Sequence, residues 1–92
     1  LRQEAAAKLA NDSDIVVVIG GRNSANTTRL AQICSTFCPR THHIESSSEL
    51  EGSWFEDAEN IGVTAGASTP PSQIEDVIAA IGRLVGTEGV GV

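Results

Sequence analysis

A run of five β-branched residues, Ile15–Ile19, constrains the fold of this 92-residue chain more than any other feature. A strand that is apolar on both faces must be covered on both faces, as happens in parallel sheets flanked by helices. Gly20 and Gly21 end the run abruptly. We therefore expect a buried strand in an α/β sheet.

The rest of the chain alternates between helical and strand patterns, without any hairpin signal. Along the helix expected after the first strand, Leu30, Ile33, Cys34 and Phe37 recur at helical spacing, and Pro39 helps to end it. Helices are expected at residues 4–10, 25–37, 48–57 and 71–84, and two further strands at 41–45 and 61–65. This alternation predicts a three-layer α/β domain with a short parallel sheet and right-handed crossovers. The domain is expected to occupy residues 1–85, with residues 86–92 as a flexible, glycine-rich tail.

The charge balance excludes some classes of partner. Six basic residues stand against twelve acidic ones, which gives a net charge of -6. A nucleic-acid binder or a protein of anionic membrane surfaces normally carries a basic stripe, so neither role is expected. There is no apolar run long enough to cross a bilayer and no secretory signal. The chain opens at Leu1 without a methionine and inside helical sequence, which suggests a fragment of something longer, although processing would give the same start.

Two loops at expected strand ends could carry chemistry. Ligands of open α/β sheets collect at the carboxyl ends of the strands, where loops meet helix N-termini. Residues 20–26 and 65–70 are such loops, with glycines for close backbone approach and Ser24, Asn26 and Ser68 as neutral donors. Together they could hold an anion. The same residue types are common helix caps, and for each loop taken singly the pattern alone favours capping.

Three segments carry a resemblance to a known family. Residues 16–30 read VVVIGGRNSANTTRL, residues 43–46 read HIES, and residues 61–70 read IGVTAGASTP. In order and spacing they resemble the last domain of LytB-type reductases. Arg2-Gln3-Glu4 also resembles the end of the Asn-Arg-Gln stretch that opens the first helix of that domain. The resemblance extends from about residue 2 to residue 84, so it covers nearly the whole expected domain.

The resemblance implies a function. LytB-type enzymes reduce 4-hydroxy-3-methylbut-2-enyl diphosphate to isopentenyl and dimethylallyl diphosphate, the last step of the non-mevalonate isoprenoid pathway. They use an iron–sulfur cluster held by three cysteines, one from each of three similar domains, and an electron donor protein. By this resemblance Ser24, Asn26 and Ser68 fall on diphosphate-binding positions. Ala25 stands where the family usually has a second serine. Its methyl group cannot donate a hydrogen bond to phosphate, whereas its backbone N–H still can, so weaker but not abolished binding is expected. The expected location is the bacterial cytoplasm, or a plastid.

The cysteines and histidines are expected to be structural. Cys34 and Cys38 lie one helical turn apart on the apolar face of the second helix, where buried free cysteines commonly pack, and their spacing seldom allows a disulfide. Because free cysteines and no export signal are expected, the protein is expected in a reducing compartment. The family's cluster cysteine in this domain would lie upstream of the first helix, so the chain alone should not catalyse. His42 and His43 point to opposite faces of a strand and cannot share a metal ion.

The remaining residues admit a simpler account. Trp54 and Phe55 are expected to cover the sheet edge or meet a neighbouring domain. The acidic residues at 45, 49, 51, 56, 57 and 59 form no evident acid–base pair, so a solvated face is expected. The competing function is a stand-alone binding or structural module, in which both loops only cap helices.

Overall fold

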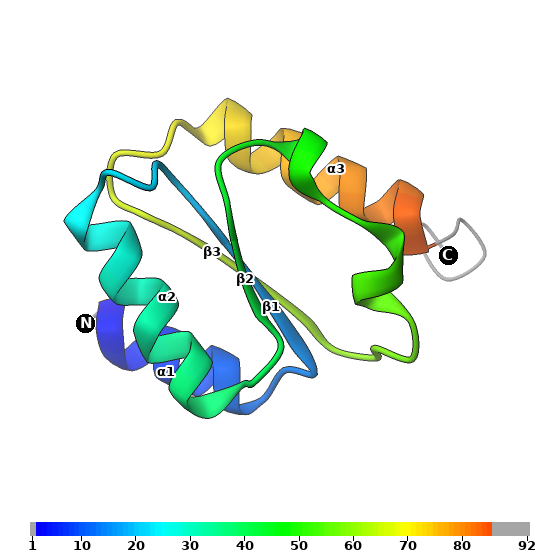
Figure 1. Ribbon diagram of the computed structural model, residues 1–92, viewed down its shortest axis with the longest axis horizontal. Helices are drawn as coiled ribbons and strands as arrows, with labels where there is room; N and C mark the ends of the chain where they lie inside the picture. The colour runs from blue at the N-terminus through cyan, green and yellow to red at the C-terminus, as the bar shows by residue number, and fades with distance from the viewer. Residues whose placement is uncertain (1, 86–92) are drawn as a thin grey trace.

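A three-stranded parallel sheet lies between two layers of helix in the computed structural model, which describes residues 2–85 (Figure 1). The strands are β1 (Ile15–Ile19), β2 (Thr41–Ile44) and β3 (Ile61–Ala65), in the order β2-β1-β3. The helices are α1 (Arg2–Asn11), α2 (Ala25–Phe37) and α3 (Pro71–Val85). The predicted fold class is confirmed. The expected tail, 86–92, and residue 1 lie outside the described residues.

Strand β1 organises the core. It pairs with β2 on one side and β3 on the other, and all five of its residues are fully buried. Val16 and Val18 pack with α1 and α2, whereas Ile15, Val17 and Ile19 pack on the face covered by α3. Continuous apolar sequence is therefore required because the strand has no solvent face.

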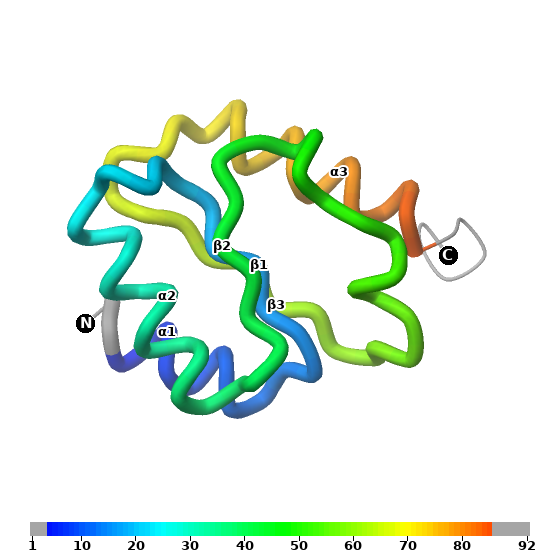
Figure 2. The backbone as a smooth tube through the Cα atoms, viewed as in Figure 1, coloured from blue at the N-terminus to red at the C-terminus, as the bar shows by residue number. Residues whose placement is uncertain are grey.

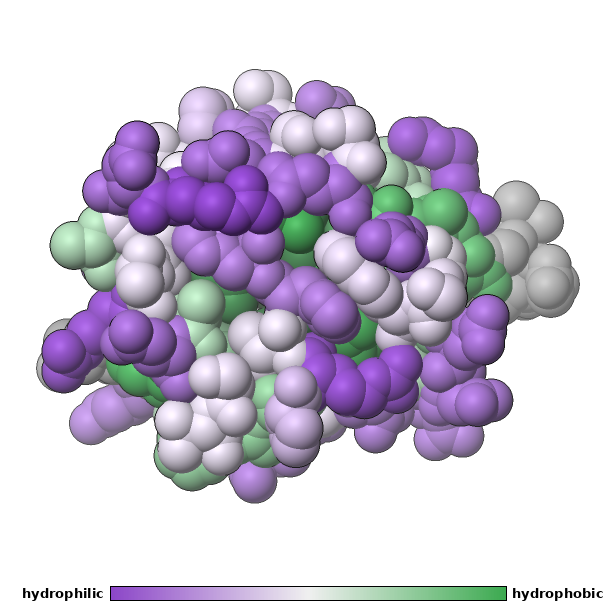
Figure 3. Space-filling model, in the orientation of Figure 1, coloured by the Kyte–Doolittle hydropathy of each residue, from purple (hydrophilic) through white to green (hydrophobic). Residues whose placement is uncertain are grey.

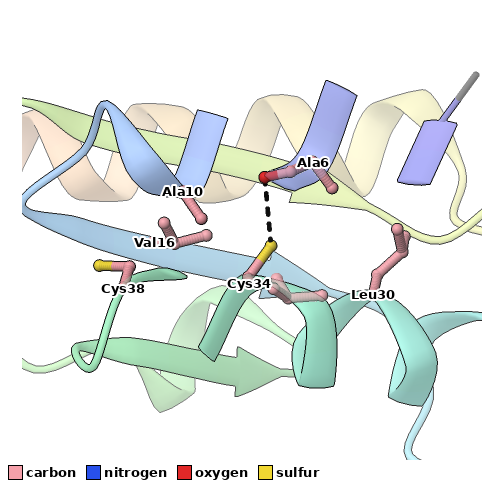
Figure 4. Packing of buried hydrophobic residues seen from close by; sticks show 7 residues of the cluster. Ala6, Ala10, Val16, Leu30, Cys34 and Cys38 are labelled. Carbon is pink, nitrogen blue, oxygen red and sulfur yellow. Dashed lines mark hydrogen bonds between the residues drawn. The ribbon is translucent and has the colours of Figure 1, made fainter. Parts of the chain in front are cut away.

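The two cysteines pack in the core layer between α1, α2 and the sheet. Cys34 and Cys38 are free thiols with 0% and 2% exposure, among Ala6, Ala10 and Val16. Figure 4 shows the Cys34 sulfur directed at the Ala6 carbonyl oxygen, at 3.8 Å. The packing role expected for both is confirmed.

The helix expected at 48–57 is wrong. The structure has two short 3-10 turns there, η1 (Ser47–Glu49) and η2 (Gly52–Phe55), separated by extended backbone at Leu50 and Glu51. Glycine and serine at 52 and 53 disfavour a helix interior, and the two turns instead let Phe55 reach the core, where it is 5% exposed. Low helix propensity at residues 52 and 53 and the burial of the Phe55 ring thus act in the same direction.

Helix α2 buries a narrower face than its pattern predicts. Its buried line is Thr27, Leu30 and Cys34, continued by Cys38 just beyond the helix. Phe37 lies about 60° to the side of Cys34 at 100° per residue, and it is 49% exposed. The prediction that Phe37 belongs to the apolar face is wrong at this position.

The outer edge of β2 is covered by an aromatic pair. The Trp54 and His42 rings are stacked, with their centroids 3.9 Å apart and an angle of 6° between the ring planes. Trp54 therefore covers the edge strand β2, as expected, whereas the same expectation is wrong for Phe55, which lies in the core beneath α3. Within residues 2–85, no helix combines the length and the apolar composition that crossing a membrane requires.

Candidate anion-binding site

The loops that follow β1 and β3 leave the sheet side by side. Ile19 pairs with Ala65, so the first loop (20–24) and the second loop (66–70) start level with each other. The first leads to α2 on one face of the sheet and the second to α3 on the other (Figure 2). Divergent connections from adjacent parallel strands open a crevice at the strand ends, which is where α/β domains bind ligands.

Hydrogen bonds tie the two loops together. The Ala67 N–H donates to Oδ1 of Asn26 over 3.1 Å. The Gly66 N–H and the Thr69 hydroxyl both donate to the Ile19 carbonyl oxygen, over 3.0 and 3.1 Å. Because Oδ1 of exposed Asn26 accepts this bond, its side-chain NH₂ group remains able to donate.

Ser24 caps helix α2 without losing its capacity to donate. Its hydroxyl oxygen accepts from the Thr27 N–H over 3.3 Å, and its backbone is extended as an N-cap requires. A hydroxyl that accepts in a cap still has a hydrogen to donate, so capping and anion binding are compatible. Ala25 is the first residue of α2 and is exposed. Ser68 is exposed, and its hydroxyl has no hydrogen-bond partner within residues 2–85.

An ion-pair network lies beside the first loop, and the sequence reading missed it. Arg22 approaches Glu45 at 3.3 Å and hydrogen-bonds Glu49, while Glu45 Oε2 accepts from the Arg22 N–H at 2.8 Å. The loop after β2 is thereby held against the first loop. In Figure 3 hydrophilic residues gather over this end of the molecule. Arg22 is paired with two carboxylates, so the other candidate donors of the two loops are neutral. Glu45 is exposed and Glu49 is partly exposed, as expected for a solvated face, but the sequence did not predict their pairing with Arg22.

Replacing Arg22 by glutamine is expected to raise the pKa of Glu49. The hydrogen bond from Arg22 is the main cause that lowers this pKa, followed by the bond from the Glu45 N–H. A carboxyl whose pKa is lowered by folding stabilises the fold above its unfolded pKa, and this contribution is lost as the pH falls through the folded pKa. The stability difference between wild type and Arg22→Gln should therefore shrink in acid.

Carbon-detected titration of the Glu49 carboxyl measures this pKa directly. The matched control is Arg83→Gln, which removes an exposed arginine of α3 and should leave the Glu49 titration unchanged. An unchanged Glu49 midpoint in Arg22→Gln would show that the ion pair does not form in solution.

The histidines do not converge, as the sequence predicts. The His43 ring nitrogen Nε2 donates to the Gly20 carbonyl oxygen at 2.9 Å, whereas His42 stacks on Trp54. Burial, with the charge of Arg40 as a smaller cause, lowers the pKa of His42. Across residues 2–85, no three histidine, cysteine, aspartate or glutamate side chains come close enough to share a metal ion.

The cysteines do not fit as ligands of an iron–sulfur cluster. Both are enclosed by apolar side chains, and burial raises the pKa of the Cys34 thiol, with Cys38 as a second cause. Ligation requires the thiolate, which burial disfavours at Cys34.

An apolar hollow of about 540 Å³ borders the second loop. It lies along the free edge of β3, between α1 and the start of α3, and Gly66, Ala67 and Thr69 form its polar end. The candidate residues Ser24, Ala25, Asn26 and Ser68 do not line it. The candidate anion site is therefore the surface between the loops, next to this hollow.

The fold and the tied loops define a class of protein: a parallel three-layer α/β domain with neutral donors gathered at its topological switch point. Within that class the comparison with known families is specific. The sequence profile of the family described as LytB protein matches residues 1–82. The chain belongs to the LytB family.

Its relatives share one name. The chain is 56% identical over 81 residues to 4-hydroxy-3-methylbut-2-enyl diphosphate reductase of Geobacter sulfurreducens, covering 88% of this chain and 29% of the relative. Identity to the Pelobacter propionicus reductase is 51% over 84 residues, covering 91% of this chain and 30% of the relative. The chain thus spans about 30% of the length of these relatives.

Solved structures of reductases also resemble this chain. A structure of (E)-4-hydroxy-3-methyl-but-2-enyl diphosphate reductase, described as the terminal enzyme of the non-mevalonate pathway, matches with a TM-score of 0.87 and 45% identity, over 89% of this chain and 29% of that one. The Plasmodium falciparum E-1-hydroxy-2-methyl-but-2-enyl-4-diphosphate reductase matches with a TM-score of 0.81 at 21% identity, over 88% of this chain and 26% of its own, which supports the fold alone.

Proposed function

We propose that residues 1–85 are the C-terminal domain of a LytB-type 4-hydroxy-3-methylbut-2-enyl diphosphate reductase and supply one wall of its diphosphate site. Ser24, Asn26 and Ser68 donate to the phosphate oxygens, together with the Ala25 N–H. The observation that carries the proposal is the hydrogen bond from Ala67 to Asn26, because it brings both donor loops to one place.

The donors suit a diphosphate held by geometry instead of by net charge. The start of α2 offers free N–H groups and a partial positive charge, and the hydroxyl and amide donors add directional bonds. The chain's net charge of -6 provides no long-range attraction for an anion. Substrate and products carry the same diphosphate, so these contacts anchor both equally and leave the acceleration of the reaction to other groups.

The redox chemistry is assigned to other parts of the longer protein. In the parent enzyme an iron–sulfur cluster would supply the two electrons of the reduction, and two protons would be needed for the hydroxyl oxygen to leave as water. Since Cys34 and Cys38 do not fit as its ligands, the cluster cysteines come from outside residues 2–85. The partners of this domain are then the remaining domains of the enzyme and, for the whole protein, an electron donor. The location we propose is the cytoplasm, in keeping with the bacterial relatives.

Titration of the chain with pyrophosphate, followed by amide NMR shifts, tests the binding site. The signals of Ser24, Asn26 and Ser68 are expected to move together with one dissociation constant. The matched variant Ser24→Gly retains a good N-cap residue but removes the hydroxyl, so binding should weaken while α2 persists. If none of the three signals moves, both loops only cap helices, and the chain is better described as a stand-alone binding or structural module without a diphosphate site.

A chimera tests the parent activity. Residues 2–82 of this chain replace the matched region of the Geobacter sulfurreducens reductase, and turnover of the hydroxylated diphosphate is measured. The chimera is expected to retain activity within about tenfold of the parent. A tenfold loss corresponds to about 1.4 kcal/mol of weaker substrate binding. A chimera that folds and holds its cluster but has no turnover would contradict the assignment.

Serine at position 25 is expected to tighten pyrophosphate binding. Ala25 is exposed at the first position of α2, where a hydroxyl would be close to an anion at the helix start. One charge-assisted hydrogen bond contributes roughly 1.5–3 kcal/mol, or about tenfold or more in affinity. The same substitution at exposed Ala79 of α3 is the control and should change nothing. Equal affinity of Ala25→Ser and wild type would refute the role of this position.

A further inference from the structure

Thr27 has a buried hydroxyl without a partner. The residue is in the first turn of α2 and has 0% exposure, and its Oγ1 atom forms no hydrogen bond within the described chain. A buried hydroxyl in this state destabilises a fold relative to an apolar side chain of the same shape. The presence of threonine instead of valine therefore needs a reason.

The Thr27 side chain lies between the starts of the two loops. A Cβ atom built on Gly20 would lie 2.4 Å from Oγ1 of Thr27, and one built on Gly66 would lie 2.1 Å from the same atom. Gly20 directly follows β1 and Gly66 directly follows β3. The backbones of both loops thus approach one hydroxyl more closely than any residue with a side chain would permit.

This contact fixes the separation of the loops. A hydroxyl oxygen is smaller than a methyl group and tolerates close C–H groups of glycine, so threonine fits between the two backbones where valine would push them apart. The next residue back, Asn26, carries the bond to Ala67 across the same gap. A change in the gap therefore moves the first-loop donors relative to Ser68.

We propose that Thr27 is a positioning residue of the diphosphate site, whose hydroxyl sets the spacing between the Ser24–Asn26 donors and the Ser68 loop. This inference rests on the proposed function. The spacing matters for an anion with two phosphate groups, which reaches both loops. A single phosphate at the start of α2 needs only one of them. Thr27 consequently governs the preference for diphosphate over orthophosphate.

The test compares Thr27→Val, which places a methyl at the Oγ1 position, with Thr27→Ser, which keeps the hydroxyl. Each chain is titrated with pyrophosphate and with orthophosphate by NMR. Thr27→Val is expected to bind pyrophosphate about tenfold more weakly while orthophosphate changes less than about threefold, and Thr27→Ser should remain within about threefold of wild type for both. Hydrogen exchange of the Ala67 amide should accelerate in Thr27→Val and not in Thr27→Ser, without any anion present.

If Thr27→Val does not fold, Thr27→Ala replaces it in the same titrations. The alanine variant leaves a gap between the loops and cannot overfill the site. It too should lose the preference for pyrophosphate. Unchanged selectivity and unchanged Ala67 exchange in the folded variants would overturn the positioning role and leave the proposed function standing. An equal loss of both anions would also overturn it, since that marks general destabilisation. Absence of pyrophosphate binding by the wild-type chain would instead overturn the proposed function, and this inference with it.

Discussion

Replacing Gly66 by alanine is expected to remove measurable pyrophosphate binding and to lower the stability of the domain. The new Cβ would lie 2.1 Å from Oγ1 and 3.3 Å from Cβ of Thr27, both inside the buried gap between the loops. Thr27 is fully buried and cannot rotate into solvent, so the second loop must move away from the start of α2. Overfilling a packed site costs about 1–3 kcal/mol. A loss of this size lowers the melting temperature of a domain this small by roughly 4–8 °C for each kcal/mol.

The matched control is Gly21→Ala in the first loop. A Cβ there would meet only the Glu45 carboxylate, at 3.9 Å, which is ordinary contact. This variant should melt close to wild type and bind pyrophosphate normally. Calorimetry and the pyrophosphate titration measure the two effects separately. If Gly66→Ala and Gly21→Ala behave alike, the close packing of the loops on Thr27 is not what holds the site.

Phe55→Ala should unfold the domain at a much lower urea concentration. Phe55 is 5% exposed and packs with Ile44, Val77 and Ile81 between the sheet and α3. Truncating a buried phenylalanine typically costs 3–5 kcal/mol, and a domain has only about 5–15 kcal/mol in total. Because Val77 and Ile81 of α3 share this cluster with Phe55, α3 should lose protection from hydrogen exchange first.

Phe37→Ala is the control because it makes the same chemical change on an exposed side chain. Phe37 is 49% exposed at the end of α2, and a surface change of this kind usually alters stability by about 0.5 kcal/mol or less. Urea titration of both variants gives the comparison. A similar loss in the two would mean that the buried position of Phe55 does not hold in solution.

The contrast between Phe37 and Phe55 shows which features a sequence pattern predicts and which it does not. The spacing of Leu30, Cys34 and Phe37 predicts helix α2 correctly, with both of its ends. It does not say where the buried face stops, since this depends on where α1 and the sheet lie beneath the helix. Phe55 lies in a segment predicted as helix that is two 3-10 turns instead, and the second of these turns places its ring in the core.

The candidate site divides in the same way. Ser24, Asn26 and Ser68 were named from two loops at expected strand ends, and their roles as diphosphate ligands stay predictions. The pairing of Ile19 with Ala65 places these loops together, and no local pattern contains that register. The sequence does not predict the roles of Arg22, Glu45 and Thr27, because a charged residue in a loop or a threonine in the first turn of a helix has no signature until its neighbours are known.

By itself the sequence determined the three strands, the helices α1, α2 and α3, and the burial of β1, but not the 3-10 turns η1 and η2. Those outcomes follow from short-range physics: β-branched side chains, helical spacing, and residues that cap or break a helix. Only the tertiary structure decided which strand lies beside which, which phenylalanine is buried, and how closely two glycines approach Thr27. These depend on contacts between residues far apart in the chain, whose energies are fixed by packing and not by local preference.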